Sequence, residues 1–143
     1  MQATDPAPAA SAALAEAGVW LELTTLVIPG HNDTDAELRA LTRWIVETLG
    51  PMVPWHVSRF FPAHRMADTA PTPPATLLRA AQIGQEAGLR YVYVGNAPEL
   101  RMEDTRCPGC DLVLVERRGY RSRSRLGSDG ECPGCGRLTE GRW

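Results

Sequence analysis

The hydrophobic positions of this chain form three apolar runs that alternate with segments of helical periodicity. The run at 19–28, VWLELTTLVI, is apolar almost throughout and rich in β-branched residues, which predicts a strand buried on both faces of a parallel sheet. Shorter runs at 54–62 and 89–96 predict two further strands. Strands that alternate with helices favour right-handed crossovers, so the pattern predicts an α/β fold with a parallel sheet.

Two full helices are predicted between these strands. Thr34 followed by Glu37 fits a capping box, and the helix then runs to Gly50. Its apolar stripe consists of Leu38, Leu41, Ile45 and Leu49. The second helix is predicted at 75–88, where Thr72 and Pro73 could cap its start. A partial helix is also expected at 10–18, after a Pro/Ala-rich beginning.

All four cysteines lie in two copies of Cys-Pro-Gly-Cys: Cys107, Cys110, Cys132 and Cys135. Two such knuckles facing each other supply four sulfurs in a tetrahedron, which leaves no open coordination position for catalysis. The pattern predicts a structural zinc ribbon, and a single iron in the same cage is the alternative. So short a segment has little core, so metal binding should supply its folding free energy.

Composition and charge limit the classes of partner that this chain is expected to bind. The net charge of −2 argues against a chain dominated by attraction to nucleic acid or membranes. No apolar run approaches the length of a membrane span, and the N-terminus has acids where a signal peptide has basic residues. We therefore expect a cytoplasmic protein with reduced thiols. The arginines at 117–125 could grip phosphates, but nearby Asp and Glu favour a solvated hairpin edge, so nucleic acid is not expected as a partner.

Several motifs follow one another in a specific order: TTLVIPG at 24–30, PWHVSRFFPA at 54–63, YVYVGN at 91–96, and then the two knuckles. From about Leu14 to Trp143 the chain resembles the C-terminal half of AmmeMemoRadiSam system radical SAM enzymes, which are relatives of pyruvate formate-lyase activating enzymes. The resemblance implies the last βα units of a partial TIM-like barrel, followed by a zinc ribbon. In a complete family enzyme, a reduced 4Fe-4S cluster cleaves S-adenosylmethionine to a radical that abstracts hydrogen from a substrate.

The chain departs from this family at a decisive point. It contains no Cys-x-x-x-Cys-x-x-Cys loop, whose three thiolates would hold the cluster. The resemblance thus implies a tail and partial helix at 1–18, a C-terminal barrel part at 19–100, and the ribbon at 101–143. We expect a fragment that does not generate a radical alone and whose partner is a separate N-terminal half or a protein substrate. The alternative is a non-catalytic zinc-ribbon adaptor that binds protein or nucleic acid.

Parallel α/β sheets bind ligands at the carboxyl ends of their strands, which here lie at 29–33, 61–66 and 95–99. The resemblance places His64 near the adenosyl group of S-adenosylmethionine. His31 and Asn32 lie at another expected adenosyl-contacting edge, although simple turn chemistry is the favoured explanation for them. Arg59 could meet the carboxylate of the ligand, and alternation places His56 on the opposite face of the same strand.

Overall fold

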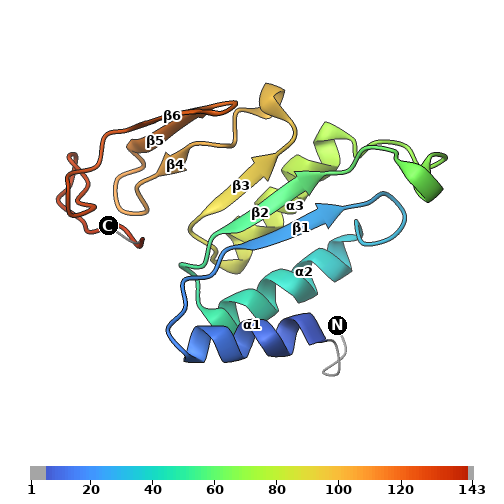
Figure 1. Cartoon of the computed structure of the whole chain (residues 1–143), viewed down its shortest axis with the longest axis horizontal. Coiled ribbons are helices and arrows are strands. Elements are labelled where there is room, and N and C mark those ends of the chain that lie inside the picture. The colour runs from blue at the N-terminus through green and yellow to red at the C-terminus, as the bar shows by residue number, and fades with distance from the viewer. Residues whose placement is uncertain (1–5, 142–143) are drawn as a thin grey trace.

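A parallel three-stranded sheet forms the first part of the computed structural model, which describes residues 6–141. Its strands are β1 (Leu23–Val27), β2 (Trp55–Arg59) and β3 (Val92–Gly95), in the order β1-β2-β3 (Figure 1). The helices are α1 (Pro6–Glu16), α2 (Asp35–Trp44), its π-helical continuation η1 (Ile45–Leu49) and α3 (Pro74–Ala87). The predicted parallel α/β unit is confirmed.

The start of α2 follows the predicted cap with one difference. The hydroxyl of Thr34 accepts from the backbone N–H of Glu37 at 3.3 Å, as an N-cap should. The Glu37 carboxylate, however, accepts from that same hydroxyl at 2.6 Å. The hydroxyl thus links the first turn of the helix from both sides, and the cap fixes where the chain leaves the loop after β1.

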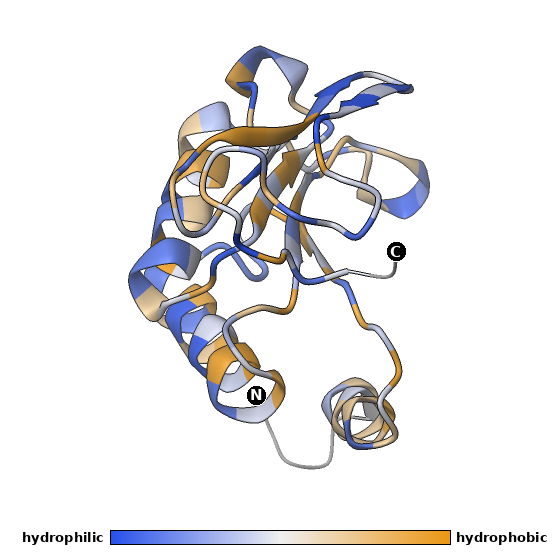
Figure 2. Ribbon diagram, turned by 90° about the vertical axis from the view of Figure 1, so that its left-hand side faces the viewer, coloured by the Kyte–Doolittle hydropathy of each residue, from blue (hydrophilic) through white to orange (hydrophobic). Residues whose placement is uncertain are grey.

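One hydrophobic core lies between the sheet and the two helices. Leu38 and Ile45 from α2 and η1, and Leu77 and Ile83 from α3, are buried against the strands. From the sheet, the core receives Val27, Trp55, Val57 and Val94. Both helices lie along the same side of the sheet (Figure 2), as right-handed crossovers in one direction require.

The opposite face of the sheet has no helix over it among the described residues. Leu26 on this face is 44% exposed and Thr24 is also exposed. The prediction that the first strand is buried on both faces is therefore wrong for this chain, because both crossover helices pack on one side. The strand is also shorter than the predicted 19–28, since its pairing with β2 begins at Leu23 opposite Trp55.

A separate antiparallel sheet contains the cysteines. It consists of β4 (Thr105–Arg106), β5 (Val113–Arg118) and β6 (Arg121–Ser124), in the order β4-β5-β6. Short 3-10 turns, η2 (His64–Met66) and η3 (Pro98–Leu100), lie in the loops. The second sheet contacts β3, where the hydroxyls of Tyr93 and Thr105 are 2.9 Å apart.

At the two ends of the chain, the predicted ranges differ from the elements and residues that the structure describes. The helix expected at 10–18 is present as α1 and begins earlier, at Pro6. Residues 1–5 of the predicted tail and 142–143 of the predicted ribbon lie outside the described part. Within residues 6–141, no helix combines the length and apolar character needed to cross a membrane.

Candidate functional site

The four cysteine sulfurs converge at the base of the β4-β5-β6 sheet. Sγ atoms lie 3.6 Å apart for Cys107 and Cys135, and 3.7 Å apart for Cys110 and Cys132. All four sulfurs lie within 4.8 Å of one another. A tetrahedron with zinc–sulfur bonds of about 2.3 Å has sulfur–sulfur edges of about 3.8 Å. The cage therefore has the size of a site for one tetrahedral metal ion.

The two knuckles repeat the same backbone pattern. In the first, Cys107 N–H donates to the Leu112 carbonyl at 2.8 Å, and Asp111 N–H donates back to the Cys107 carbonyl at 2.9 Å. The second repeats both bonds at 2.9 Å, from Cys132 to Arg137 and from Gly136 to Cys132. Each turn is closed by two backbone hydrogen bonds, so each presents its pair of sulfurs from a loop of the same shape.

The glycine inside each knuckle lies against a sulfur of the other knuckle. A Cβ on Gly109 would lie 3.5 Å from Sγ of Cys135, and one on Gly134 would lie 3.3 Å from Sγ of Cys110. Each glycine N–H also donates to the first sulfur of its own knuckle at 3.4 Å. Small residues thus allow the two turns to approach, and their amides partly neutralise thiolate charge.

The thiols of Cys107 and Cys110 differ in pKa. Burial opposes ionisation of Cys107, but amide donors from Gly109 and Cys110 and the neighbouring thiols outweigh it and lower the pKa to about 7. The amide of Leu112 favours the thiolate of Cys110, yet burial and the other three thiols raise its pKa to about 12. Four thiolates so close together repel one another, so a bound cation is needed to ionise them all.

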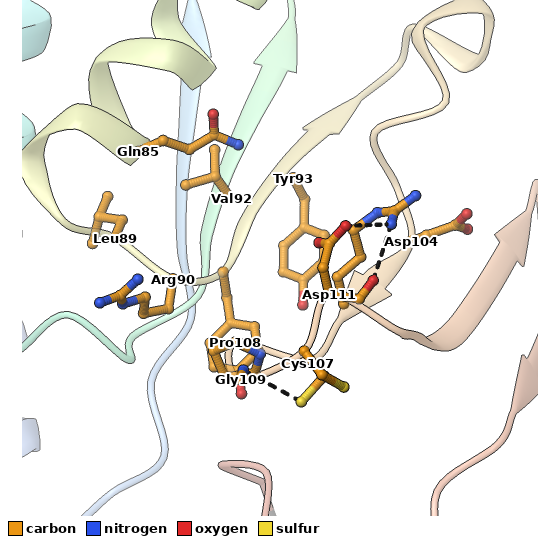
Figure 3. A pocket seen from close by; sticks show the side chains of 13 residues that line it. Gln85, Leu89, Arg90, Val92, Tyr93, Asp104, Cys107, Pro108, Gly109 and Asp111 are labelled. Atoms are coloured by element: carbon orange, nitrogen blue, oxygen red, sulfur yellow. Dashed lines mark hydrogen bonds and ion pairs between the residues drawn. The ribbon is translucent and has the colours of Figure 1, made fainter. Parts of the chain in front are cut away.

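A cavity of about 570 Å³ borders the first knuckle, between β3 and the loop from Cys107 to Asp111. Figure 3 shows the N–H of Gly109 beside the sulfur of Cys107 at one end of it. At the other end, Arg106 forms an ion pair of 3.0 Å with Asp111. The cavity is open and polar, and the bonds around it hold the knuckle in shape.

The carboxyl ends of β1, β2 and β3 share one edge of the parallel sheet (Figure 1). His31 and His64 are exposed in the loops at this edge, and His64 has a positive φ of 49°. Asn32 is occupied by the turn: its carbonyl oxygen accepts from the Ile28 N–H at 2.7 Å, and its amide donates to the Leu26 carbonyl at 3.0 Å. The structure therefore favours a role for Asn32 in stabilising the turn. The imidazoles of His31 and His64 remain accessible to solvent.

The side chain of Arg59 is held by contacts with other residues of the chain. Its guanidinium donates to the Thr72 carbonyl at 2.9 Å and to the Glu99 carboxylate at 3.0 Å, and it lies 5.0 Å from the centre of the Phe61 ring. The side chain is thus engaged on three sides. Its contacts join the end of β2 to Thr72 and to η3, so Arg59 shapes the end of the sheet at which the two histidines lie.

Thr72 is a buried anchor at this edge, where the sequence had indicated a helix cap. Its hydroxyl donates to the Val27 carbonyl at 2.6 Å and accepts from the Phe60 N–H at 2.9 Å. It thereby ties the end of β1 to the end of β2, while Pro73 occupies the N-cap of α3.

Replacing Thr72 with valine should destabilise the protein by about 2 kcal/mol, because two buried backbone groups lose their partner. Urea unfolding of the full chain measures the loss. Thr72→Ser keeps the hydroxyl and is the matched control, expected to lose less than half as much. Equal losses would show that the methyl group, and not the hydrogen bonds, makes the contribution.

A second polar cluster lies on the face of the parallel sheet that has no helices. It includes residues that the sequence analysis did not single out. Nε2 of His56 lies 2.8 Å from a carboxylate oxygen of Glu22, and its ring stacks on Tyr93 at 4.9 Å. The guanidinium of Arg117 lies 5.5 Å from the Tyr93 ring centre, which connects the cluster to the second sheet. Alternation along β2 gave the signal for His56; its partner 34 residues away required the fold.

Comparison with known proteins gives one informative match. The chain is 41% identical over 106 residues to uncharacterized protein MJ0808 of Methanocaldococcus jannaschii. The match covers 74% of this chain and 32% of that protein, so the chain spans about a third of the length of the relative it matches. Neither a known protein family nor a solved structure matches the chain.

Proposed function

We propose that this chain is the C-terminal unit of a radical SAM enzyme of the activating-enzyme kind, in which it forms part of the S-adenosylmethionine-facing edge. The observation that carries the proposal is the parallel sheet with helices on one face and polar residues on the other. Thr24, His56 and Ser58 project to the face without helices, which the second sheet contacts at Tyr93. The outer edge of β1 has no strand beside it among the described residues. A barrel wall has this organisation, since helices cover its outside and its inside faces the ligand.

Within this proposal the residues at the carboxyl edge have different tasks. His64 and His31 are accessible and would contact the adenosyl ligand. Asn32 and Arg59, whose polar groups are occupied, would hold the loops in position. In a complete family enzyme, the cluster supplies the electron that cleaves the ligand. The sequence contains no loop of three thiolates that would hold the cluster, so under this proposal the chain alone does not cleave S-adenosylmethionine.

The cysteine cage is best explained as a structural zinc site. Four sulfurs fill a tetrahedral ion completely and leave no position for water or substrate. A single iron would also fit this ligand set. Thiolates that bind zinc must stay reduced, so we propose a reducing compartment such as the cytoplasm for the protein.

A genomic and a biochemical experiment test the proposal in sequence. The DNA before the codon of Met1 and the adjacent genes should encode a segment with Cys-x-x-x-Cys-x-x-Cys and the missing strands. Co-expressed with this chain and reduced anaerobically with S-adenosylmethionine, that segment should yield deoxyadenosine, whereas either chain alone should not. Absence of such a coding segment, or turnover by this chain alone, would contradict the proposal. The first of these outcomes would favour the adaptor function.

A further inference from the structure

The hairpin of β5 and β6 has an outward face that consists mainly of arginines. Residues paired across antiparallel strands share a face, so Arg118 with Arg121, and Glu116 with Arg123, lie on one side. Arg117, paired with Ser122, lies on the other side and faces Tyr93 of the parallel sheet. The first side therefore points away from the α/β unit. In Figure 2 the far end of the hairpin is the blue, hydrophilic part at the top.

Three arginines of this segment have no counter-charge in the described structure. Arg117 and Arg118 are held by bonds to residues 103–105 and to Glu116. By contrast, the side chains of Arg121, Arg123 and Arg125 form no ion pair or hydrogen bond with residues 6–141, and all three are exposed. They occupy every second position, so their Cα atoms follow one another at about 6.8 Å along an extended chain.

The acidic residues nearby form no ion pair with Arg121, Arg123 or Arg125 within residues 6–141. Asp111 is paired with Arg106, and Asp129 accepts from the backbone N–H of Glu131. Glu116 lies opposite Arg123, but its carboxylate contacts Arg118 at 3.0 Å. The guanidinium groups of Arg121, Arg123 and Arg125 are therefore available to an anionic ligand.

The turn of the same hairpin exposes an aromatic ring. Tyr120 follows Gly119, which has a φ of 58°, and has a relative solvent accessibility of 111%. The other two tyrosines, Tyr91 and Tyr93, each hydrogen-bond to the chain and are mostly covered. Charges on an edge strand also discourage strand pairing, but that role does not require an exposed ring beside them.

We propose that this hairpin binds single-stranded nucleic acid. Arg121, Arg123 and Arg125 would contact successive phosphates, and Tyr120 would stack on a base. A row of cations next to an accessible aromatic ring is the arrangement with which proteins bind single strands without reading their sequence. The inference is independent of the proposed enzymatic role, and it departs from the sequence-based expectation because the side-chain pairing shows which charges are free.

The test is the binding of a fluorescein-labelled oligouridylate of about 12 nucleotides to the zinc-loaded full chain, followed by fluorescence anisotropy. Three phosphate contacts predict that log K falls with log salt concentration with a slope of about −2. The triple variant R121Q/R123Q/R125Q should bind at least about tenfold more weakly and with a slope near zero. The control R43Q/R65Q/R90Q removes three exposed arginines elsewhere, with the same change in charge, and should bind like the wild type.

Tyr120 separates stacking from simple charge attraction. Tyr120→Ala should weaken binding about fivefold or more, and Tyr120→Phe should retain it. Unchanged zinc content verifies that each variant is folded. The proposal is overturned by any of four results: no binding at low salt, equal losses in the two triple variants, no effect of Tyr120→Ala, or tighter binding of a labelled polyglutamate peptide. The last result would identify an acidic protein as the partner.

Discussion

Cys132→Ser is expected to abolish stoichiometric zinc binding and to unfold the segment from about Thr105 onward. Among the described residues, the buried hydrophobic cluster of this segment consists of Cys107, Cys132 and Leu114, with Leu112, Val115 and Leu126 partly buried against them. So small a core cannot offset the conformational entropy of ordering the chain. Structural zinc supplies about 10–16 kcal/mol in comparable peptides, and loss of one of four ligands removes much of it.

Hydrogen exchange followed by mass spectrometry gives the readout for this variant. Amides of β5 and β6 should lose their protection, while those of β1 to β3 keep most of theirs. Ser122→Ala, on the exposed part of the same hairpin, is the control and should change neither zinc content nor exchange. Equal loss of protection in both sheets would show that they unfold as one cooperative unit, which the contacts of Tyr93 with Thr105 would then explain.

Trp55→Ala should cost about 3–5 kcal/mol of unfolding free energy, the usual range for a large aromatic side chain removed from a core. Trp55 is 0% exposed, and its indole N–H donates to the Thr25 hydroxyl at 2.9 Å. α3 approaches it so closely that a Cβ on Gly84 would lie 2.6 Å from the ring. The substitution therefore leaves a cavity between β2 and α3 and breaks the bond to β1.

The chain offers a control of the same residue type. Trp20 is 38% exposed, so Trp20→Ala should cost less than about 1 kcal/mol in the same urea titration. Similar losses for the two variants would mean that the core does not centre on Trp55.

The individual helices and strands of this fold could be predicted from the sequence, but the side of the sheet on which the helices pack could not. Thr34 and Glu37 predict the start of α2 because a cap depends on neighbours three residues apart. The apolar run at 19–28 predicts a strand but does not say how many layers cover it. Both helices pack on one side, so Leu26 remains exposed, and pairing with the five-residue β2 shortens the strand to Leu23–Val27.

The same distinction applies to the candidate sites. The cysteines were predictable because each knuckle is a local turn with fixed spacing. The partners of Arg59 and Thr72 lie 12–45 residues away, so sequence reasoning could not show that Arg59 is occupied or that Thr72 is an anchor. The exposure of Tyr120 is likewise a property of where the hairpin projects.

We propose that the four cysteines form one mononuclear metal centre, which leaves none to hold an iron–sulfur cluster. Native mass spectrometry of the full chain, purified and reconstituted anaerobically with zinc, iron and sulfide, tests it most directly. We expect a single bound zinc ion per chain, lost in Cys132→Ser, and no mass for inorganic sulfide. A species carrying four irons and four sulfides on Cys107, Cys110, Cys132 and Cys135, or a metal-free chain in which β5 and β6 remain folded, would contradict it.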